Sequence, residues 1–283
     1  MAGIIKGAEV AGAIRERIME TISTHGLVPC LVLLRVGNNP GDLAYERGIR
    51  KTCEAAGIEV RVFEFAADVG QEELLAGLAT ANEDPEIHGI LIFKPLPAHI
   101  DTFAIDRAIC PEKDMDCISP ANWARLAMAP GEGFAPCTAE AVVKLLDHVG
   151  CEISGANAVI IGRSNVIGKP LGLLLLARSA TVTWCHSRTR DIADRCKGAD
   201  ILISACGVAG LVGENIAKGV SPGCVAIDVG MNFADGKMCG DMKFDEVAPY
   251  VKMITPVPGG VGAVTNTVLA LHVTLAALKR HKA

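Results

Sequence analysis

Residues 158–176 read AVIIGRSNVIGKPLGLLLL and constrain the fold more than any other stretch. The short β-branched run 158–161 has the length of a buried strand and ends at Gly162. After Gly168, an unbroken apolar run predicts a helix from Leu171. Strand, glycine turn and helix form the first half of a βαβ unit, whose helix N-terminus favours a pyrophosphate because its backbone N–H groups are free. The spacing differs from G-x-G-x-x-G, so a tight turn that binds nothing stays an alternative.

The next predicted strand, residues 180–185 (ATVTWC), indicates which dinucleotide such a unit would bind. NAD-binding folds place a carboxylate at the end of this strand to hold the ribose hydroxyls. Here the strand is followed by Ser187 and Arg188, with no acid beside them. A hydroxyl and a guanidinium suit a phosphate group. Together with Arg163, they predict NADP as the cofactor.

Apolar runs along the rest of the chain predict an α/β protein. Two more buried strands follow in the second half, as in a parallel sheet covered on both faces. In the first half, strands alternate with amphipathic helices, which predicts a second α/β layer. Asp42 is the expected cap of one of these helices, and residues 231–253 are expected to be irregular. The further expected strands are 30–36, 58–65, 88–93, 200–205 and 224–229, and the expected helices are 8–23, 42–56, 71–81, 139–149 and 265–281.

Composition narrows the classes of function. The net charge of −5 and the absence of a basic cluster argue against nucleic acid as a partner. Eleven cysteines are scattered without metal-type pairing, so we expect reduced thiols in the cytoplasm and no metal site. The N-terminus lacks the long apolar region of a signal peptide, and no uninterrupted apolar run has the length of a membrane span. No membrane association is expected.

Five stretches together resemble one enzyme family. They read PEKDMD (111–116), PCT (136–138), GRSNVIGKP (162–170), CHSRT (185–189) and TPVPGGVG (255–262). The chain resembles the methylenetetrahydrofolate dehydrogenase/cyclohydrolase family from end to end. The resemblance implies a folate domain over 1–137 plus 264–283 and a Rossmann-type NADP domain over 138–263, with a cleft between them, and a homodimer.

The resemblance also implies a reaction on tetrahydrofolate one-carbon derivatives. Hydride passes from the methylene bridge of 5,10-methylenetetrahydrofolate to NADP, and the methenyl cation results. In bifunctional members of the family, water then opens this cation to 10-formyltetrahydrofolate.

Family positions can be transferred residue by residue. On the cofactor side the resemblance implies Gly162, Arg163, Ser164, Gly168 and Ser187, to which Arg188 is added from its own chemistry. On the folate side Asp116 would hold the pterin ring, because a carboxylate accepts paired N–H donors. Tyr45 would stack along the folate, and Pro258 and Gly259 would line it with backbone. Without the resemblance, each residue also has an ordinary structural interpretation. Asp116 fits an exposed loop acid, Tyr45 a half-buried helix tyrosine, and Pro258 and Gly259 a structural turn.

Three departures from the family gather around one expected pocket. The family has Tyr-x-x-x-Lys, and that lysine is the general acid/base of the cyclohydrolase step; the position four after Tyr45 is Ile49 here. An isoleucine cannot exchange a proton. The family's glutamine in Val-Gln-Leu-Pro-Leu-Pro is replaced by Phe93, and its serine three residues before the tyrosine by Asp42.

Three interpretations of these departures compete. In the first, the dehydrogenase remains and the cyclohydrolase is weak or absent. In the second, another cation takes the lysine's place. Lys94 is the first candidate because it is one residue from the lost glutamine, at the end of the strand. Lys51 is the second, since Arg50 and Lys51 are turned about 100° and 200° from Ile49 on a helix. In the third, the substrate has changed, or the protein binds folate and NADP without catalysis. The candidate catalytic residues are therefore Asp116, Lys94 and Tyr45.

Overall fold

The computed structural model describes residues 2–234 and 236–282 and divides into two compact units. The six-stranded unit contains the residues up to Gly12 together with Thr138–Thr265. The three-stranded unit contains Ala13–Cys137 together with the residues from Asn266 onward. Each unit is built around its own parallel sheet.

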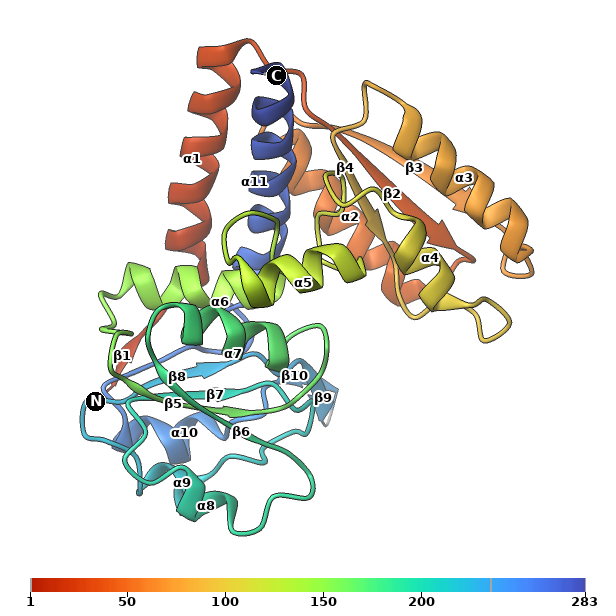
Figure 1. The fold of residues 1–283 in the computed structure, drawn as a ribbon. Helices are drawn as coiled ribbons and strands as arrows, with labels where there is room; N and C mark the ends of the chain where they lie inside the picture. Colours follow the sequence, from red (N-terminus) through yellow and green to blue (C-terminus); the bar gives the residue numbers. More distant parts are fainter. Residues whose placement is uncertain (1, 235, 283) are drawn as a thin grey trace. The chain divides into compact units, whose positions relative to one another are not determined.

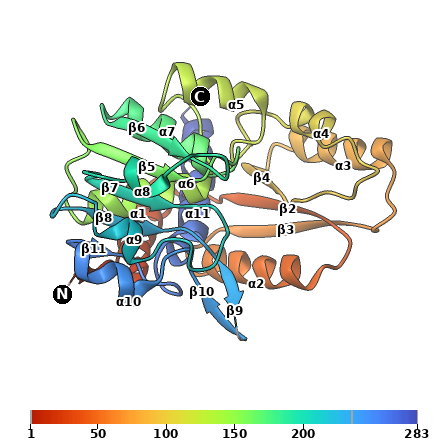
Figure 2. The same cartoon turned by 90° about the horizontal axis from the view of Figure 1, so that it is seen from below.

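The three-stranded unit has the strand order β3-β2-β4, with every pairing parallel. Parallel neighbours need helical crossovers, and α2 lies on one face of the sheet while α3 and α4 lie on the other (Figure 2). The β2 side chains of Cys30, Val32 and Leu34 point to the α3 and α4 face and are buried with them in one apolar cluster. The elements are α1 (Gly7–His25), β2 (Cys30–Val36), α2 (Pro40–Glu54), β3 (Glu59–Phe65), α3 (Gln71–Glu83), β4 (Gly89–Ile92), α4 (Thr102–Ala108), α5 (Pro120–Met128) and α11 (Gly262–His281).

Helix α2 begins earlier than the sequence predicted, and its cap is not Asp42. Asn39 is the N-cap, and its side-chain oxygen accepts the N–H of Gly41 at 2.8 Å. Pro40 occupies the first helical position, where its fixed φ suits the helix and its missing N–H costs nothing. Asp42 lies inside the first turn.

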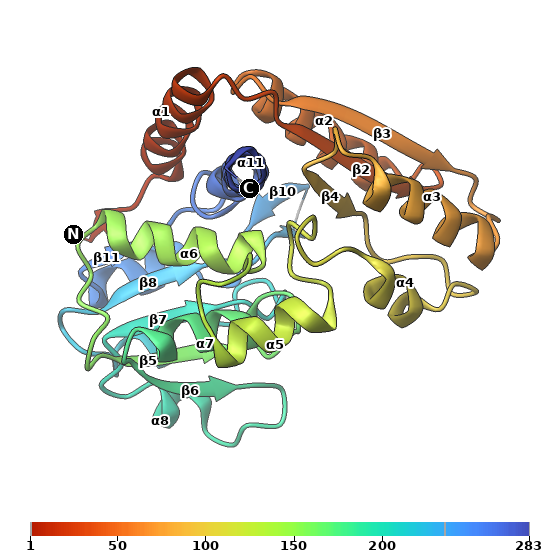
Figure 3. The ribbon, with the colours of Figure 1, turned by 45° about the horizontal axis from the view of Figure 1, so that its top comes forward.

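The six-stranded unit has the strand order β1-β11-β8-β7-β5-β6, with every pairing parallel. Its strands β6, β5, β7 and β8 lie side by side in Figure 3. The chain runs from β5 to β6 on one side and then returns to β7 on the other side, so the order reverses between β5 and β7. The strands are β1 (Gly3–Ile4), β5 (Asn157–Ile161), β6 (Thr181–Cys185), β7 (Ile201–Ser204), β8 (Val225–Asp228) and β11 (Met253–Ile254).

Helices cover both faces of this sheet, with α6 and α7 on one face and α8, α9 and α10 on the other (Figure 1). This arrangement explains why the strands are nearly continuous apolar runs. The four residues of β7 and the four of β8 are all buried. The helices are α6 (Cys137–His148), α7 (Gly168–Ala177), α8 (Ile192–Arg195), α9 (Glu214–Ala217) and α10 (Phe244–Val247).

The first residues, which the sequence assigned to domain 1–137, pair through β1 with β11 and group with the six-stranded unit by their contacts. One prediction about chain organisation needs correction. Residues 231–253 are not irregular: β9 (Asn232–Ala234) and β10 (Lys237–Cys239) form an antiparallel hairpin, followed by α10, a 3₁₀ turn at Ala248–Tyr250 and β11. These elements have two to four residues each, which is too short to give a readable periodicity.

The closing helix α11 is, within the described residues, the one helix long and apolar enough to cross a membrane by length and composition. The sequence prediction considered only uninterrupted apolar runs and therefore passed over it. However, 56% of its most apolar window is buried inside the protein. Such burial is typical of a core helix, and its residues from Asn266 onward belong to the three-stranded unit.

Candidate functional site

The glycine turn after β5 is closed so tightly that only glycine fits at two positions. Gly162 has a φ of +143°, and a Cβ there would lie 2.3 Å from the carbonyl oxygen of Ala205. A Cβ on Gly168 would lie 2.4 Å from the carbonyl oxygen of Gly162. Because Gly162 and Gly168 have no side chains, the turn, α7 and the end of β7 can lie close together. The sequence predicted that such a turn holds the pyrophosphate of a dinucleotide.

Side chains fix the start of α7 at the end of this turn. The Ser164 hydroxyl accepts the N–H groups of Ile167 at 3.1 Å and Gly168 at 3.4 Å. The indole N–H of Trp184 donates to the Gly168 carbonyl at 2.8 Å, and a Cβ on Gly172 would lie 2.1 Å from that ring. Ser164 therefore shapes the turn from within, whatever it contributes to a ligand.

The residues predicted to select NADP follow the neighbouring ends of β5 and β6. The N–H of Gly162 donates to the Cys185 carbonyl at 2.9 Å, which ties the glycine turn to the end of β6. Arg163, Ser187 and Arg188 are all exposed. Residues 185–190 contain no carboxylate. Two guanidinium groups and a hydroxyl near the carboxyl ends of adjacent strands suit a ribose phosphate.

In the three-stranded unit, Tyr45 on α2 contacts Phe93, which follows β4. Their ring centroids are 5.6 Å apart at an interplanar angle of 46°. Tyr45 is 40% exposed, while Phe93 is buried. Burial, and secondarily the nearby Asp116 carboxylate, raise the pKa of the Tyr45 hydroxyl. The predicted stacking residue is thus a neutral phenol with one open side.

Ile49 lies one helical turn after Tyr45 and is completely buried. The cations considered as its replacement are in ion pairs or exposed. Lys94 Nζ lies 2.5 Å from Asp106 Oδ1, and Arg50 Nε lies 3.2 Å from Glu46 Oε1. Lys51 is exposed on α2.

The stretch PEKDMD places charged side chains in the interior. Asp114 is completely buried and accepts the N–H groups of Ile118 and Ser119 at 3.0 and 2.9 Å. Lys113 is also buried and donates to the carbonyls of Ala81 and Asp84 at 2.9 and 2.7 Å. The charges face inward because backbone groups at the end of α3 and just before α5 satisfy them.

Asp116 is held at the end of that stretch by one backbone contact. Its carboxylate accepts the N–H of Cys137 at 2.8 Å. Burial raises the pKa of Asp116, and the Cys137 hydrogen bonds and His272 oppose this shift. The next residue, Cys117, has a φ of +56°, a conformation that costs a side-chain-bearing residue free energy. The backbone turns sharply at the point where Asp116 is presented.

Pro258 and Gly259 are exposed and belong to the six-stranded unit. The Gly259 carbonyl accepts the N–H of Gly7 at 2.8 Å, and Gly259 has a φ of +103°. The predicted folate residues are therefore divided between the two units, with Tyr45 and Asp116 in the other one.

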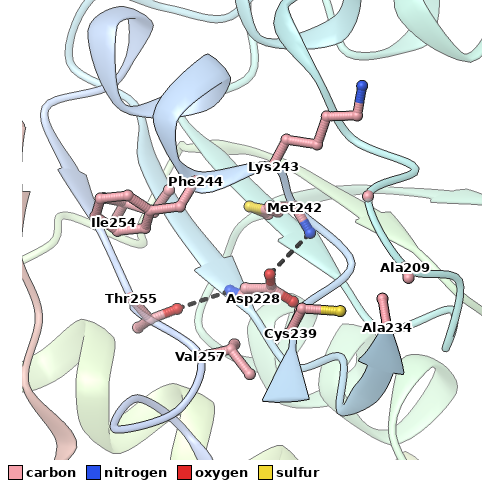
Figure 4. A pocket seen from close by; sticks show the side chains of 12 residues that line it. Ala209, Asp228, Ala234, Cys239, Met242, Lys243, Phe244, Ile254, Thr255 and Val257 are labelled. Atoms are coloured by element: carbon pink, nitrogen blue, oxygen red, sulfur yellow. Dashed lines mark hydrogen bonds between the residues drawn. The ribbon is translucent and has the colours of Figure 1, made fainter. Parts of the chain in front are cut away.

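Sequence reasoning missed two buried carboxylates in the six-stranded unit, Asp228 and Asp241. Asp228 ends β8 and lines a pocket with Lys243, Thr255 and Val257 (Figure 4). Burial raises the pKa of Asp228 to about 6, although three backbone N–H groups oppose the shift. A carboxylate at the end of a buried strand was the available signal. Over 2–234 and 236–282, no three His, Cys, Asp or Glu side chains gather as metal ligands.

Comparisons with known proteins cover the whole chain. The family model described as "Tetrahydrofolate dehydrogenase/cyclohydrolase, NAD(P)-binding domain" matches residues 136–282, and its catalytic-domain counterpart matches 5–116. The bifunctional protein FolD of Alkaliphilus oremlandii is 45% identical over 285 residues, with 99% of each chain covered.

Solved structures agree with these matches. The FolD methylenetetrahydrofolate dehydrogenase/cyclohydrolase of Campylobacter jejuni gives a TM-score of 0.95 at 36% identity, covering 99% of this chain and 100% of that one. The Trypanosoma brucei dehydrogenase-cyclohydrolase, solved with NADP cofactor and an inhibitor, gives a TM-score of 0.91 at 38% identity. The match covers 99% of this chain and 98% of that one.

Proposed function

The chain belongs to the tetrahydrofolate dehydrogenase/cyclohydrolase family, and we propose that it oxidises 5,10-methylenetetrahydrofolate with NADP but hydrolyses the methenyl product slowly. The observation that carries this proposal is Ile49, a completely buried aliphatic side chain at the position of the family's catalytic lysine. The two half-reactions make different demands on the protein, and each is considered separately.

The dehydrogenase step depends mainly on positioning. Hydride leaves the methylene carbon with both bonding electrons, and the lone pair of a flanking nitrogen stabilises the resulting methenyl cation, so no protein base is needed. NADP, when bound, accepts the hydride. The protein binds and orients the substrate: Asp116 accepts the pterin N–H donors, Tyr45 stacks along the folate, and backbone at Pro258 and Gly259 lines it.

Residues of the six-stranded unit would bind NADP. Gly162, Gly168 and the start of α7 would hold the pyrophosphate, with Ser164 shaping the turn. Arg163, Ser187 and Arg188 would hold the ribose phosphate, and the absence of a carboxylate in 185–190 removes the usual partner of free ribose hydroxyls.

The cyclohydrolase step, in contrast, requires proton transfer. Water attacks the methenyl carbon and loses a proton, and a ring nitrogen must gain one as its bond to that carbon breaks. A positioned acid–base group typically contributes about 10²- to 10⁴-fold to such a step. Ile49 cannot supply it, and Phe93 brings an apolar ring against Tyr45 where the family has an amide.

Replacement of the lysine by another cation would require a rearrangement. Lys94 remains the first candidate, but its ammonium would have to leave Asp106. Lys51 remains the second candidate. Slow hydrolysis is therefore the favoured interpretation.

Assembly and location are further parts of the proposal. We propose a homodimer that uses the β9–β10 hairpin, where Met231 and Phe233 are 69% and 74% exposed and Met238 is 37% exposed. Large apolar side chains gathered on one hairpin are typical of an interaction surface. All eleven cysteines are free thiols, which supports the cytoplasm as the compartment.

The experiment that tests the function separates the half-reactions. Purified protein is given 5,10-methylenetetrahydrofolate with NADP in one cuvette and 5,10-methenyltetrahydrofolate alone in another. We expect rapid NADPH formation in the first and a loss of methenyl absorbance close to the spontaneous rate in the second. Absence of NADPH formation would refute the dehydrogenase, and brisk enzymatic hydrolysis would refute the weak cyclohydrolase.

A further inference from the structure

In the six-stranded unit, the carboxylate of Asp241 fills a ring of backbone N–H groups on the loop that follows β7. Its Oδ2 accepts the N–H of Cys206 at 2.8 Å and of Gly207 at 3.2 Å, and its Oδ1 accepts the N–H of Val208 at 2.9 Å. Three successive N–H groups that point at one anion form a nest, a backbone shape that also binds phosphates in other proteins. Here the protein's own carboxylate occupies it.

Asp241 is completely buried and its remaining acceptor positions are also used. Ser204 Oγ donates to Oδ2 at 3.1 Å and Asn232 Nδ2 to Oδ1 at 2.9 Å. Burial opposes the charge, but the hydrogen bonds from Asn232 and Cys206 outweigh it and lower the pKa of Asp241. The group in the nest is therefore an anion at neutral pH.

A second carboxylate holds Asp241 itself in place. Asp228 Oδ1 accepts the backbone N–H of Asp241 at 3.0 Å, and Oδ2 accepts that of Met242 at 2.8 Å, the bond drawn in Figure 4. The approach is so close that a Cβ on Gly240 would lie 1.9 Å from Asp228 Oδ2. Asp241 thus sits on a rigid support at the end of β8.

The nest lies at the edge of the sheet where a ligand is expected to bind. The strand order reverses between β5 and β7, and open parallel sheets bind their ligands outside the carboxyl ends of the strands at such a point. The glycine turn follows β5 and the nest loop follows β7. The two loops lie in close contact at Gly162 and Ala205: a side chain on Gly162 would not fit, since its Cβ would lie 2.3 Å from the carbonyl oxygen of Ala205.

We infer that Asp241 is a positioning residue for the dinucleotide: it neutralises the nest of Cys206, Gly207 and Val208 and fixes this loop as a wall of the cofactor site beside the glycine turn. The phosphates are then left to the glycine turn, since the second nest is already occupied. The inference rests on the proposed use of NADP and adds a residue that does not touch the cofactor.

Asp241→Asn is the informative variant because it keeps the size of the side chain. Whichever way the new amide turns, its NH₂ group faces backbone N–H donors that need an acceptor. Asn232→Ala is the matched control, since it removes one donor to Asp241 and leaves the three N–H bonds of the nest intact. Binding of NADP is measured directly by calorimetry, together with the KM of folate and the melting temperature of each protein.

We expect Asp241→Asn to weaken NADP binding by about tenfold or more, because at least two buried hydrogen bonds are lost, while Asn232→Ala changes it by less than about threefold. The KM of the folate substrate should stay near that of the wild type. If Asp241→Asn melts at a lower temperature but binds NADP as the wild type does, Asp241 is merely structural and the inference is wrong.

Hydrogen exchange of the wild type provides a test that needs no folded variant. NADP should slow exchange of the amides of Cys206, Gly207 and Val208, and unchanged exchange at saturating NADP would overturn the inference. A wild type that binds no NADP at all would instead refute the proposed function, so the two failures are distinguishable.

Discussion

The ring of Phe93 lies against the ring of Tyr45, with 5.6 Å between their centroids. The resemblance implies a glutamine at the position of Phe93 and a lysine at the position of Ile49. Relative to that pattern, this chain has two buried apolar side chains in place of an amide and an ammonium. Paired replacement is physically consistent, because a buried ammonium without a polar partner is costly.

This pairing predicts that cyclohydrolase activity can be restored only by changing both positions. Ile49→Lys alone places an ammonium in a completely buried site and should lower stability. The double variant with Phe93→Gln should raise methenyltetrahydrofolate hydrolysis by about 10²-fold or more, as general acid–base groups typically do. Hydrolysis is followed by loss of methenyl absorbance.

The control for this experiment is Ile49→Met with Phe93→Gln, which restores the amide without the proton carrier. It should hydrolyse no faster than the wild type. Equal activity of the lysine and methionine variants would show that the pocket does not require a cation.

A second prediction concerns Lys94. Its ammonium is paired with Asp106, and both side chains are partly exposed, so the pair contributes at most about 1 kcal/mol to stability. Lys94→Met should leave NADPH formation and the melting temperature nearly unchanged. A selective loss of hydrolysis in this variant would instead identify Lys94 as the replacement cation, and Lys51→Met applies the same test to the second candidate.

Cofactor choice gives a third prediction. Arg163→Ala should weaken binding of NADP by about tenfold or more and barely affect NAD, since a charge-assisted contact to the extra phosphate is lost. Arg178→Ala removes another partly exposed arginine, one paired with Asp147, and serves as the control. If both dinucleotides lose affinity equally, Arg163 does not contact the extra phosphate.

Asp116 can be tested without disturbing its backbone contact. Asp116→Asn keeps an oxygen that accepts the N–H of Cys137 but cannot accept a pair of pterin N–H donors as a carboxylate does. Folate affinity should fall by about tenfold or more while NADP affinity stays unchanged. Unaltered folate binding, measured by calorimetry, would return Asp116 to a structural role.

The hairpin surface leads to a prediction about assembly. Phe233 is 74% exposed, so Phe233→Ser should not disturb the fold. If the hairpin forms the dimer contact, light scattering should show a shift of this variant towards the monomer at micromolar concentration. A dimer of undiminished strength would place the contact elsewhere.

The sequence predicted most of the fold because the central strands of both sheets are continuous apolar runs, as at 158–161, and β3 shows clear alternation. It failed where elements are short or partly exposed, as in β9 and β10. It also failed where two residues could each cap the same helix, as Asn39 and Asp42 could for α2. Inward-facing charges were also hidden: Asp114 looks like a loop acid until its backbone partners at Ile118 and Ser119 are known.

For the candidate site, the sequence located the departures at Ile49 and Phe93 but not the contact of Phe93 with Tyr45, which depends on where α2 and the end of β4 pack. It also missed Asp241. A carboxylate within polar sequence gives no sign that three N–H groups from a loop more than thirty residues earlier will converge on it.

The most direct test of the account is a progress curve in which NADPH and methenyltetrahydrofolate are both recorded as the wild type oxidises 5,10-methylenetetrahydrofolate. If Ile49 leaves the pocket without a proton carrier, the two products rise together in equal amounts until spontaneous hydrolysis removes the methenyl form. If NADPH rises while methenyltetrahydrofolate stays near zero, the protein hydrolyses its own product efficiently, and the central claim is wrong.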